Sequence, residues 1–216
     1  KITSTNVGFV VPRRNWTTGT VYDYYRHDIG EYATGTTTAS TTNSGATTLY
    51  DSTFYVLSST RNVYKCLDNN DNAVSTVEPS GTSTTIQLTA DGYKWKYMYT
   101  LTASMQAEFL SVDFMAVTTD STVSSAAVDG AINVIKIKTP GSAGTDGTHA
   151  SIPIRGDGTG GVCSVTIASG AVTAVTVTTP GTGYTFAYIR IADINAAGGG
   201  SLITSEIDVI IEPIGG

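Results

Sequence analysis

The sequence predicts an all-β protein: a layered antiparallel β-sandwich with a repeated β-unit in its C-terminal half and at most one short helix. Short apolar alternations recur along the chain, separated by Gly, Pro, Asn and Asp. Thr and Val are abundant, and their branched β-carbons suit a pleated strand. Helical composition is confined to residues 102–110, which could form one or two turns.

The expected strands fall into two groups. Each is a short apolar run or alternation bounded by turn residues. The N-terminal group spans residues 7–11, 54–59, 62–67, 84–89, 91–102 and 113–117. The C-terminal group spans residues 131–138, 150–154, 162–168, 171–179, 187–192 and 205–212. The run DNNDN at 68–72 predicts a hairpin turn, because Asn and Asp tolerate left-handed φ.

The chain divides into an N-terminal β-sandwich portion (1–118), a joint (119–130) and a C-terminal β portion (131–216); one continuous domain is the alternative. The low-complexity segment 33–48 is expected to be a mobile surface loop. Residues 130–144 and 170–184 share Gly, Ala, Thr, Pro and Gly at an offset of 40, which indicates an internal repeat. The start at Lys1 and the end in IEPIGG favour a piece of a longer protein.

The segment DGYKWKYMYTLT (91–102) carries an aromatic ring at four successive odd positions. Because side chains alternate between the faces of a strand, all four rings are expected on one face. Packing against an internal layer is the favoured interpretation, and contact of some rings with a partner is the alternative. Lys94 and Lys96 predict a solvated opposite face. The rings belong to Tyr93, Trp95, Tyr97 and Tyr99.

Charge and composition exclude several classes of function. The net charge is −6 with only 12 Lys and Arg, so a basic face for nucleic acid cannot be assembled. No apolar run of 18 residues or more is present, so no membrane insertion is expected. Cys66 and Cys163 are expected to be free, buried thiols, with one disulfide as the alternative.

Candidate catalytic residues are few. His27 lies beside Asp28 and four residues before Glu31, a cluster that a hydrolase could use, but a polar loop is the favoured interpretation. A glycan hydrolase would need two facing carboxylates, for which Asp23 is a further candidate. His149 has no nucleophile placed beside it by any motif. The sequence therefore predicts no catalytic residue.

Two loops imitate ligand sites. GDGTGG (156–161) resembles a phosphate loop, but a strand rather than a helix follows it, so a hairpin turn is expected. The run DNNDNA has the early spacing of a calcium loop, yet Ala73 takes the glycine position and Pro79 the place of the bidentate Glu. The sequence predicts neither a metal nor a cofactor.

The segment VPRRNW (11–16) offers possible anchors. Arg13 and Arg14 beside Trp16 suit an interface, because guanidinium groups grip carboxylates and stack on aromatic rings. Pairing with acidic neighbours inside the subunit is the alternative.

Four motifs carry a family resemblance between about residues 7 and 117: VGFVVPRRNW, LYDSTFYVLSSTRNVYKCLDNN, STVEPSGTST and DGYKWKYMYTLT. In this order they resemble the baseplate wedge subunit called gene product 8 of T-even-type contractile-tailed phages, in its version from phages of marine cyanobacteria. VDGAIN, IPIRGDGTGG and TPGTGYTFA are similar to the cyanophage-type members and depart from the T-even prototype.

The resemblance implies a layered β-sandwich that forms a homodimer and contacts other baseplate wedge subunits. It implies a virion protein of the tail baseplate, assembled in the host cytoplasm, with no enzymatic activity and no cofactor. Of its positions, Arg13, Arg14, Trp16 and Trp95 carry over as structural or interface anchors. The expected function is bracing of neighbouring wedge proteins; the alternative is a carbohydrate- or receptor-binding module, which would expose aromatic rings in a groove.

Overall fold

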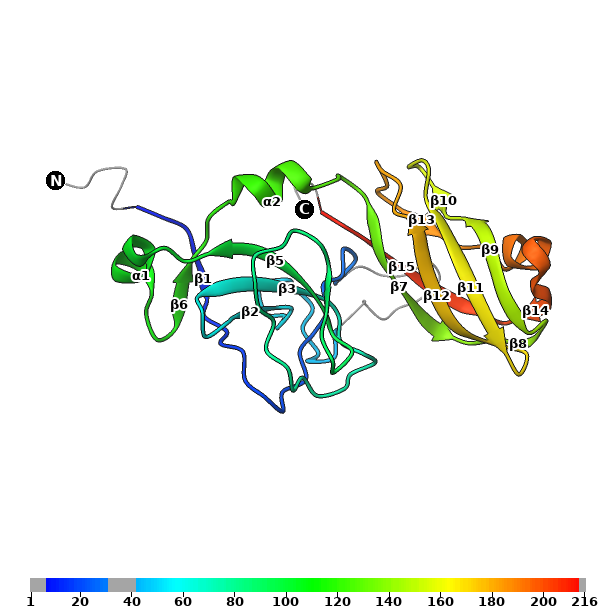
Figure 1. Cartoon of the computed structure of the whole chain (residues 1–216), viewed down its shortest axis with the longest axis horizontal. Helices are drawn as coiled ribbons and strands as arrows, with labels where there is room; N and C mark the ends of the chain where they lie inside the picture. Colours follow the sequence, from blue (N-terminus) through cyan, green and yellow to red (C-terminus); the bar gives the residue numbers. More distant parts are fainter. Residues whose placement is uncertain (1–6, 31–41, 214–216) are drawn as a thin grey trace. The chain divides into compact units, whose positions relative to one another are not determined.

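The computed structural model describes residues 7–30 and 42–213. The chain forms two compact units, Lys1–Ala126 and Ala127–Gly216, and their boundary falls within 119–130. Strands are the main regular structure of both units, and all pairs of named strands in the described residues are antiparallel (Figure 1). The predicted all-β fold class is confirmed. Residues 33–41 of the predicted mobile loop lie outside the described part.

The expectation of at most one helix is wrong, because the described residues contain three short α-helices. α1 (Ala103–Phe109) forms where expected and begins at Thr102, whose hydroxyl accepts the Met105 N–H. α2 (Ser121–Ala126) lies in the expected joint, where Asp120 accepts two free N–H groups of the first turn. α3 (Ile191–Ile194) continues as a π-helical turn, η2 (Asn195–Gly199). Each described helix is too short or too polar to cross a membrane.

The first unit contains a four-stranded sheet and a separate two-stranded ribbon. The sheet has the order β2-β3-β5-β4, and β1 pairs with β6 in the ribbon. The strands are β1 (Val10–Pro12), β2 (Tyr55–Leu57), β3 (Asn62–Asp68), β4 (Gln87–Leu88), β5 (Lys94–Thr100) and β6 (Phe114–Ala116).

A β-bulge divides the aromatic row of β5 between two cores. Tyr97 lies opposite Tyr64 of β3, whereas Tyr99 lies opposite Val63, so one extra residue of β5 is inserted between the two pairs. Because Val63 and Tyr64 point to opposite faces, Tyr97 and Tyr99 do so as well. The prediction that the rings are buried is confirmed, but the prediction that all four share one face is wrong. Tyr93, Trp95 and Tyr97 join one cluster and Tyr99 another.

The DNNDN segment adopts left-handed backbone without making a hairpin. Asn70, Asp71 and Asn72 have φ values of 49°, 52° and 64°. The chain then runs through a long loop to β4, which pairs with β5 and not with β3. The expected turn is therefore present, but the predicted hairpin is wrong.

The second unit is built from short antiparallel sheets around one core. Its sheets have the orders β12-β11-β9, β15-β7, β14-β8 and β10-β13 (Figure 1). Residues 187–192 form a strand only at their start, because α3 begins at Ile191. The strands are β7 (Ile132–Thr139), β8 (Ser142–Gly144), β9 (Gly147–Pro153), β10 (Arg155–Gly156), β11 (Val162–Ala168), β12 (Ala171–Thr179), β13 (Ala187–Tyr188), β14 (Gly200–Ile203) and β15 (Glu206–Ile211).

The two copies of the predicted repeat bond to each other reciprocally. The third residue of each copy donates its N–H to the proline carbonyl of the other: Ile132 to Pro180 at 3.0 Å, and Val172 to Pro140 at 2.9 Å. The last residue of each copy likewise donates to the first of the other, Gly144 to Gly170 and Tyr184 to Gly130. The repeat therefore builds the unit with an internal two-fold relation.

Both cysteines are free and buried, as predicted. Cys66 packs in the cluster that contains Trp95, and Cys163 packs in the core of the second unit. Burial raises the pKa of the Cys163 thiol to about 11. Both side chains act as small apolar core residues.

Candidate interaction surfaces

Arg13 and Arg14 tie loops of the first unit together. The Arg13 guanidinium donates to the Asn15 side chain and to the Ser111 carbonyl, each at 2.9 Å. Arg14 donates to the carbonyls of residues 50 and 51, both at 3.1 Å, and its guanidinium lies 5.5 Å from the Tyr55 ring centroid. The oxygens that accept these bonds are carbonyl and amide oxygens of the same unit, so these contacts organise loops.

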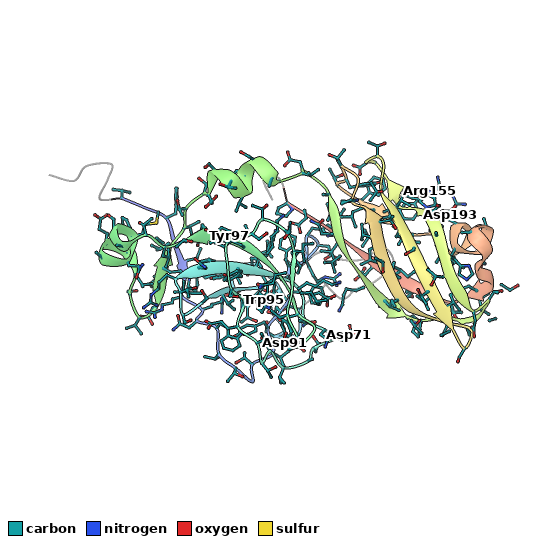
Figure 2. The ribbon with its side chains drawn as sticks, viewed as in Figure 1. Asp71, Asp91, Trp95, Tyr97, Arg155 and Asp193 are labelled. Atoms are coloured by element: carbon teal, nitrogen blue, oxygen red, sulfur yellow. The ribbon has the colours of Figure 1, made fainter. Side chains whose placement is uncertain are left out.

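Trp16 and Trp95 both belong to the core around β3 and β5. The Trp16 indole donates to Ser75 Oγ at 3.0 Å, and its half-buried ring packs on the core. Trp95 is fully buried, stacked on Tyr93 at 5.4 Å and meeting Tyr22 edge to face at 5.7 Å (Figure 2). Its Nε1 is a buried donor without a hydrogen-bond partner in the described residues.

The face of β5 opposite Trp95 is not solvated, contrary to the prediction. Lys96 is buried and lies opposite Lys65, which is also buried. The Lys65 ammonium lies 4.9 Å from the centre of the Tyr25 ring, which covers it. Only Lys94, paired with Asp68 at 3.3 Å, keeps an exposed side chain. Tyr25, which is distant in the sequence, thus helps to cover this face, which strand alternation could not reveal.

The carboxylates proposed for a hydrolase already have structural partners. Asp23 is buried and accepts four hydrogen bonds, from the Ser44 and Thr53 N–H groups and from two serine hydroxyls. Burial raises the pKa of Asp23, but these bonds outweigh it and leave the pKa below its ordinary value. Asp28 is held by the Arg26 fork at 2.7 and 2.9 Å. Glu31 lies outside the described residues.

The remaining polar candidates are also parts of turns. His149 Nε2 lies 2.8 Å from the Thr145 carbonyl. GDGTGG joins β9 to β11 as the predicted hairpin turn, and Ile154 donates to the Gly161 carbonyl across it. Within residues 7–30 and 42–213, no three His, Cys, Asp or Glu side chains gather in a way that could hold a metal ion.

A small pocket of about 190 Å³ adjoins the aromatic core. It is lined by Tyr64, Tyr97, Gln87 and the loop 80–85. A sugar stacks on an open ring face, but Tyr64 is 1% and Tyr97 6% exposed. The buried rings therefore offer no platform of the kind that a carbohydrate-binding module would expose.

The most exposed apolar side chains of the first unit lie on and beside the β1–β6 ribbon. The sequence did not predict this ribbon as an exposed surface. Phe9 is 85% and Val112 86% exposed. The ribbon contacts the core through Met115, which is fully buried, and through Val11, which lies opposite it. The sequence signal for this surface was in VGFVV and SVDFMAV, two apolar runs with too few polar residues to form a polar, solvated face. We define the apolar ribbon as Val7, Phe9, Val10, Val112, Phe114 and Val117, all exposed.

Comparisons with protein-family models, characterised proteins and solved structures find no significant match to this chain. The resemblance to baseplate wedge subunits therefore rests on the sequence motifs quoted above.

Proposed function

We propose that this protein is a non-catalytic structural subunit of a phage tail baseplate wedge, which braces neighbouring wedge proteins and works as a homodimer. The observation that carries the proposal is the apolar ribbon. Six large apolar side chains are exposed on this short ribbon and its flanks, and exposed apolar surfaces of soluble proteins commonly serve as interfaces. A mainly apolar surface can also pack against its own copy, as a two-fold interface requires.

The fate of the polar side chains supports the same proposal. The candidate acids, Asp23 and Asp28, are engaged by hydrogen bonds within the unit. The candidate anchors, Arg13 and Arg14, donate hydrogen bonds to the carbonyls of Ser111 and Asp51 and so hold the loops at these residues. The described side chains thus supply shape and rigidity, which is what a bracing subunit needs.

The test is light scattering on the purified protein, alone and mixed with the other wedge subunits of the same phage. We expect a dimer alone and a heavier, defined complex in the mixture. A persistent monomer that ignores those subunits would overturn the proposal.

A further inference from the structure

A second exposed face lies on β13 of the second unit. Ala187 and Ile189 pack against the core of that unit, so the alternating residues Phe186, Tyr188 and Arg190 point outward. Phe186 is 56% and Tyr188 46% exposed, and the Arg190 side chain is 54% exposed. Aromatic residues and arginine together are the composition of an interface centre.

Arg155 joins this face from the neighbouring strand. It lies directly opposite Tyr188 in the β10–β13 register. Its guanidinium grips the Asp193 carboxylate with two bonds, at 2.9 and 3.1 Å, and Figure 2 shows the two residues close together. This pairing shows that a planar carboxylate fits the guanidinium geometry at this place.

The end of the face that carries Arg155 and Arg190 has more positive than negative charge. The Arg190 side chain makes no hydrogen bond within the described residues, and its Nε lies 3.8 Å from Asp193, the same carboxylate that Arg155 holds. Two guanidinium groups therefore share one carboxylate. At the opposite end, Asp157 accepts the N–H groups of Thr185 and Phe186, so the positive charge is confined to the arginine end.

We propose that the face formed by Phe186, Tyr188, Arg190 and Arg155 binds an acidic segment of another protein, with apolar side chains over the two rings and a carboxylate on Arg190. Charge complementarity selects this partner, because Arg155 takes both short hydrogen bonds of Asp193 and the more distant Arg190 guanidinium can still donate to a second carboxylate. Nucleic acid is disfavoured by the net charge of −6. The inference rests on the proposed structural role and names the kind of neighbour that the second unit contacts.

The probe is a fluorescein-labelled peptide with two leucines followed by two glutamates, and its twin has glutamines instead. We expect fluorescence polarisation to show that the glutamate peptide binds at least about tenfold more tightly than its glutamine twin. A factor of this size corresponds to one contact between a carboxylate and Arg190. Arg190→Ala should abolish this difference. Lys138→Ala, which removes another exposed cation that is paired with a carboxylate in the same unit, should preserve it. Added salt should weaken binding of the glutamate peptide alone.

Equal affinity for the two peptides, absence of binding at millimolar concentration, or an equal loss in Lys138→Ala would overturn the inference. If Arg190→Ala changes the mass of the protein alone in light scattering, the occupant is a second copy and the inference is also wrong. Wedge assembly that is insensitive to Arg190→Ala would refute this inference while leaving the proposed function intact.

Discussion

Single carboxylates hold the loops of the first unit. Asp91 (Figure 2) accepts N–H bonds from Thr76 and Val77 and a hydroxyl bond from Ser75, just as Asp23 gathers residues 44, 52 and 53. Long irregular segments with little secondary structure are thereby fixed to the sheet. An ionised carboxylate suits this task because it accepts several donors at once.

The first prediction concerns Asp23. Asp23→Asn removes the charge and places an amide donor among four donors, so we expect unfolding to become easier by about 2–3 kcal/mol. Urea denaturation measures the change. Asp113→Asn is the matched control, because Asp113 is exposed and its side chain makes no hydrogen bond or ion pair in the described residues; there the change should stay below about 0.5 kcal/mol. Equal effects would contradict the role of Asp23.

The second prediction concerns acid. The folded pKa values of Asp23, Asp28 and Asp91 lie below their ordinary values: burial raises each pKa, and hydrogen bonds to the carboxylate lower it by more. Their stabilisation is therefore complete above the unfolded pKa of about 4 and is lost as the pH falls through the lower folded values. Urea midpoints should stay level from pH 7 to 5 and drop below about pH 4. A smaller drop is expected for Asp23→Asn, and an undiminished drop would argue against this residue.

At the scale of elements, the bulge in β5 decides which core each ring enters. Alternation alone predicted that Tyr93 to Tyr99 would be buried, because aromatic rings at every second position need a dry face. It could not predict the face change at Tyr99, because a bulge depends on the register with β3 and leaves no mark in the β5 sequence. The same limit applies to Lys65, which the distant Tyr25 covers.

The third prediction tests the bulge. Met98 is the extra residue, so its deletion removes the bulge and still leaves Tyr97 opposite Tyr64 and Tyr99 opposite Val63. Deleting Lys96, which has its own partner on β3, would instead put Trp95 and Tyr97 on opposite faces. We expect the first unit to keep its protected amides in hydrogen exchange after the Met98 deletion and to lose them after the Lys96 deletion. Met98→Ala keeps the register and should cost only about 1 kcal/mol, because this side chain is only partly buried. A Met98 deletion as damaging as the Lys96 deletion would contradict the assignment of the bulge.

In the second unit, the sequence pattern predicted the strand boundaries well where the paired strands are neighbours in the chain. β11 and β12 were predicted to the residue, because each alternates cleanly and a two-residue turn joins them. That turn, Ser169 and Gly170, has positive φ at both positions, as a tight hairpin needs. The strands β8, β10 and β14 were missed, because they are two to four residues long and pair only through tertiary contacts.

The fourth prediction concerns the repeat. Gly181 has φ +65°, and a Cβ there would lie 2.6 Å from the Gly161 nitrogen and 2.7 Å from the Thr159 oxygen. Gly183 has φ +74° with open space around it. Gly183→Ala should cost about 1–2 kcal/mol from backbone strain alone. Gly181→Ala should cost a further 1–3 kcal/mol or so from crowding, measured by hydrogen exchange of β11 and β12. Equal costs would show that crowding is absent.

At the scale of the whole molecule, most polar chemistry is used internally and the exposed apolar side chains gather at defined places. Arg13, Arg14, Trp16 and Trp95 were predicted as structural or interface anchors, and their contacts in the structure lie within the first unit. The apolar ribbon was not predicted as a surface, since its apolar runs also suit a buried strand. Exposure of a short strand depends on what covers it in the fold.

The most direct test of this account is the mass of the protein in solution by light scattering. We predict twice the chain mass of 22.5 kDa for the native protein and for Leu88→Asp, which charges an exposed apolar residue outside the ribbon. Phe9→Asp should give the mass of one chain, because a charge cannot be buried in a two-fold apolar contact. A native protein with the mass of one chain, or a Phe9→Asp variant that still has twice that mass, would contradict the account.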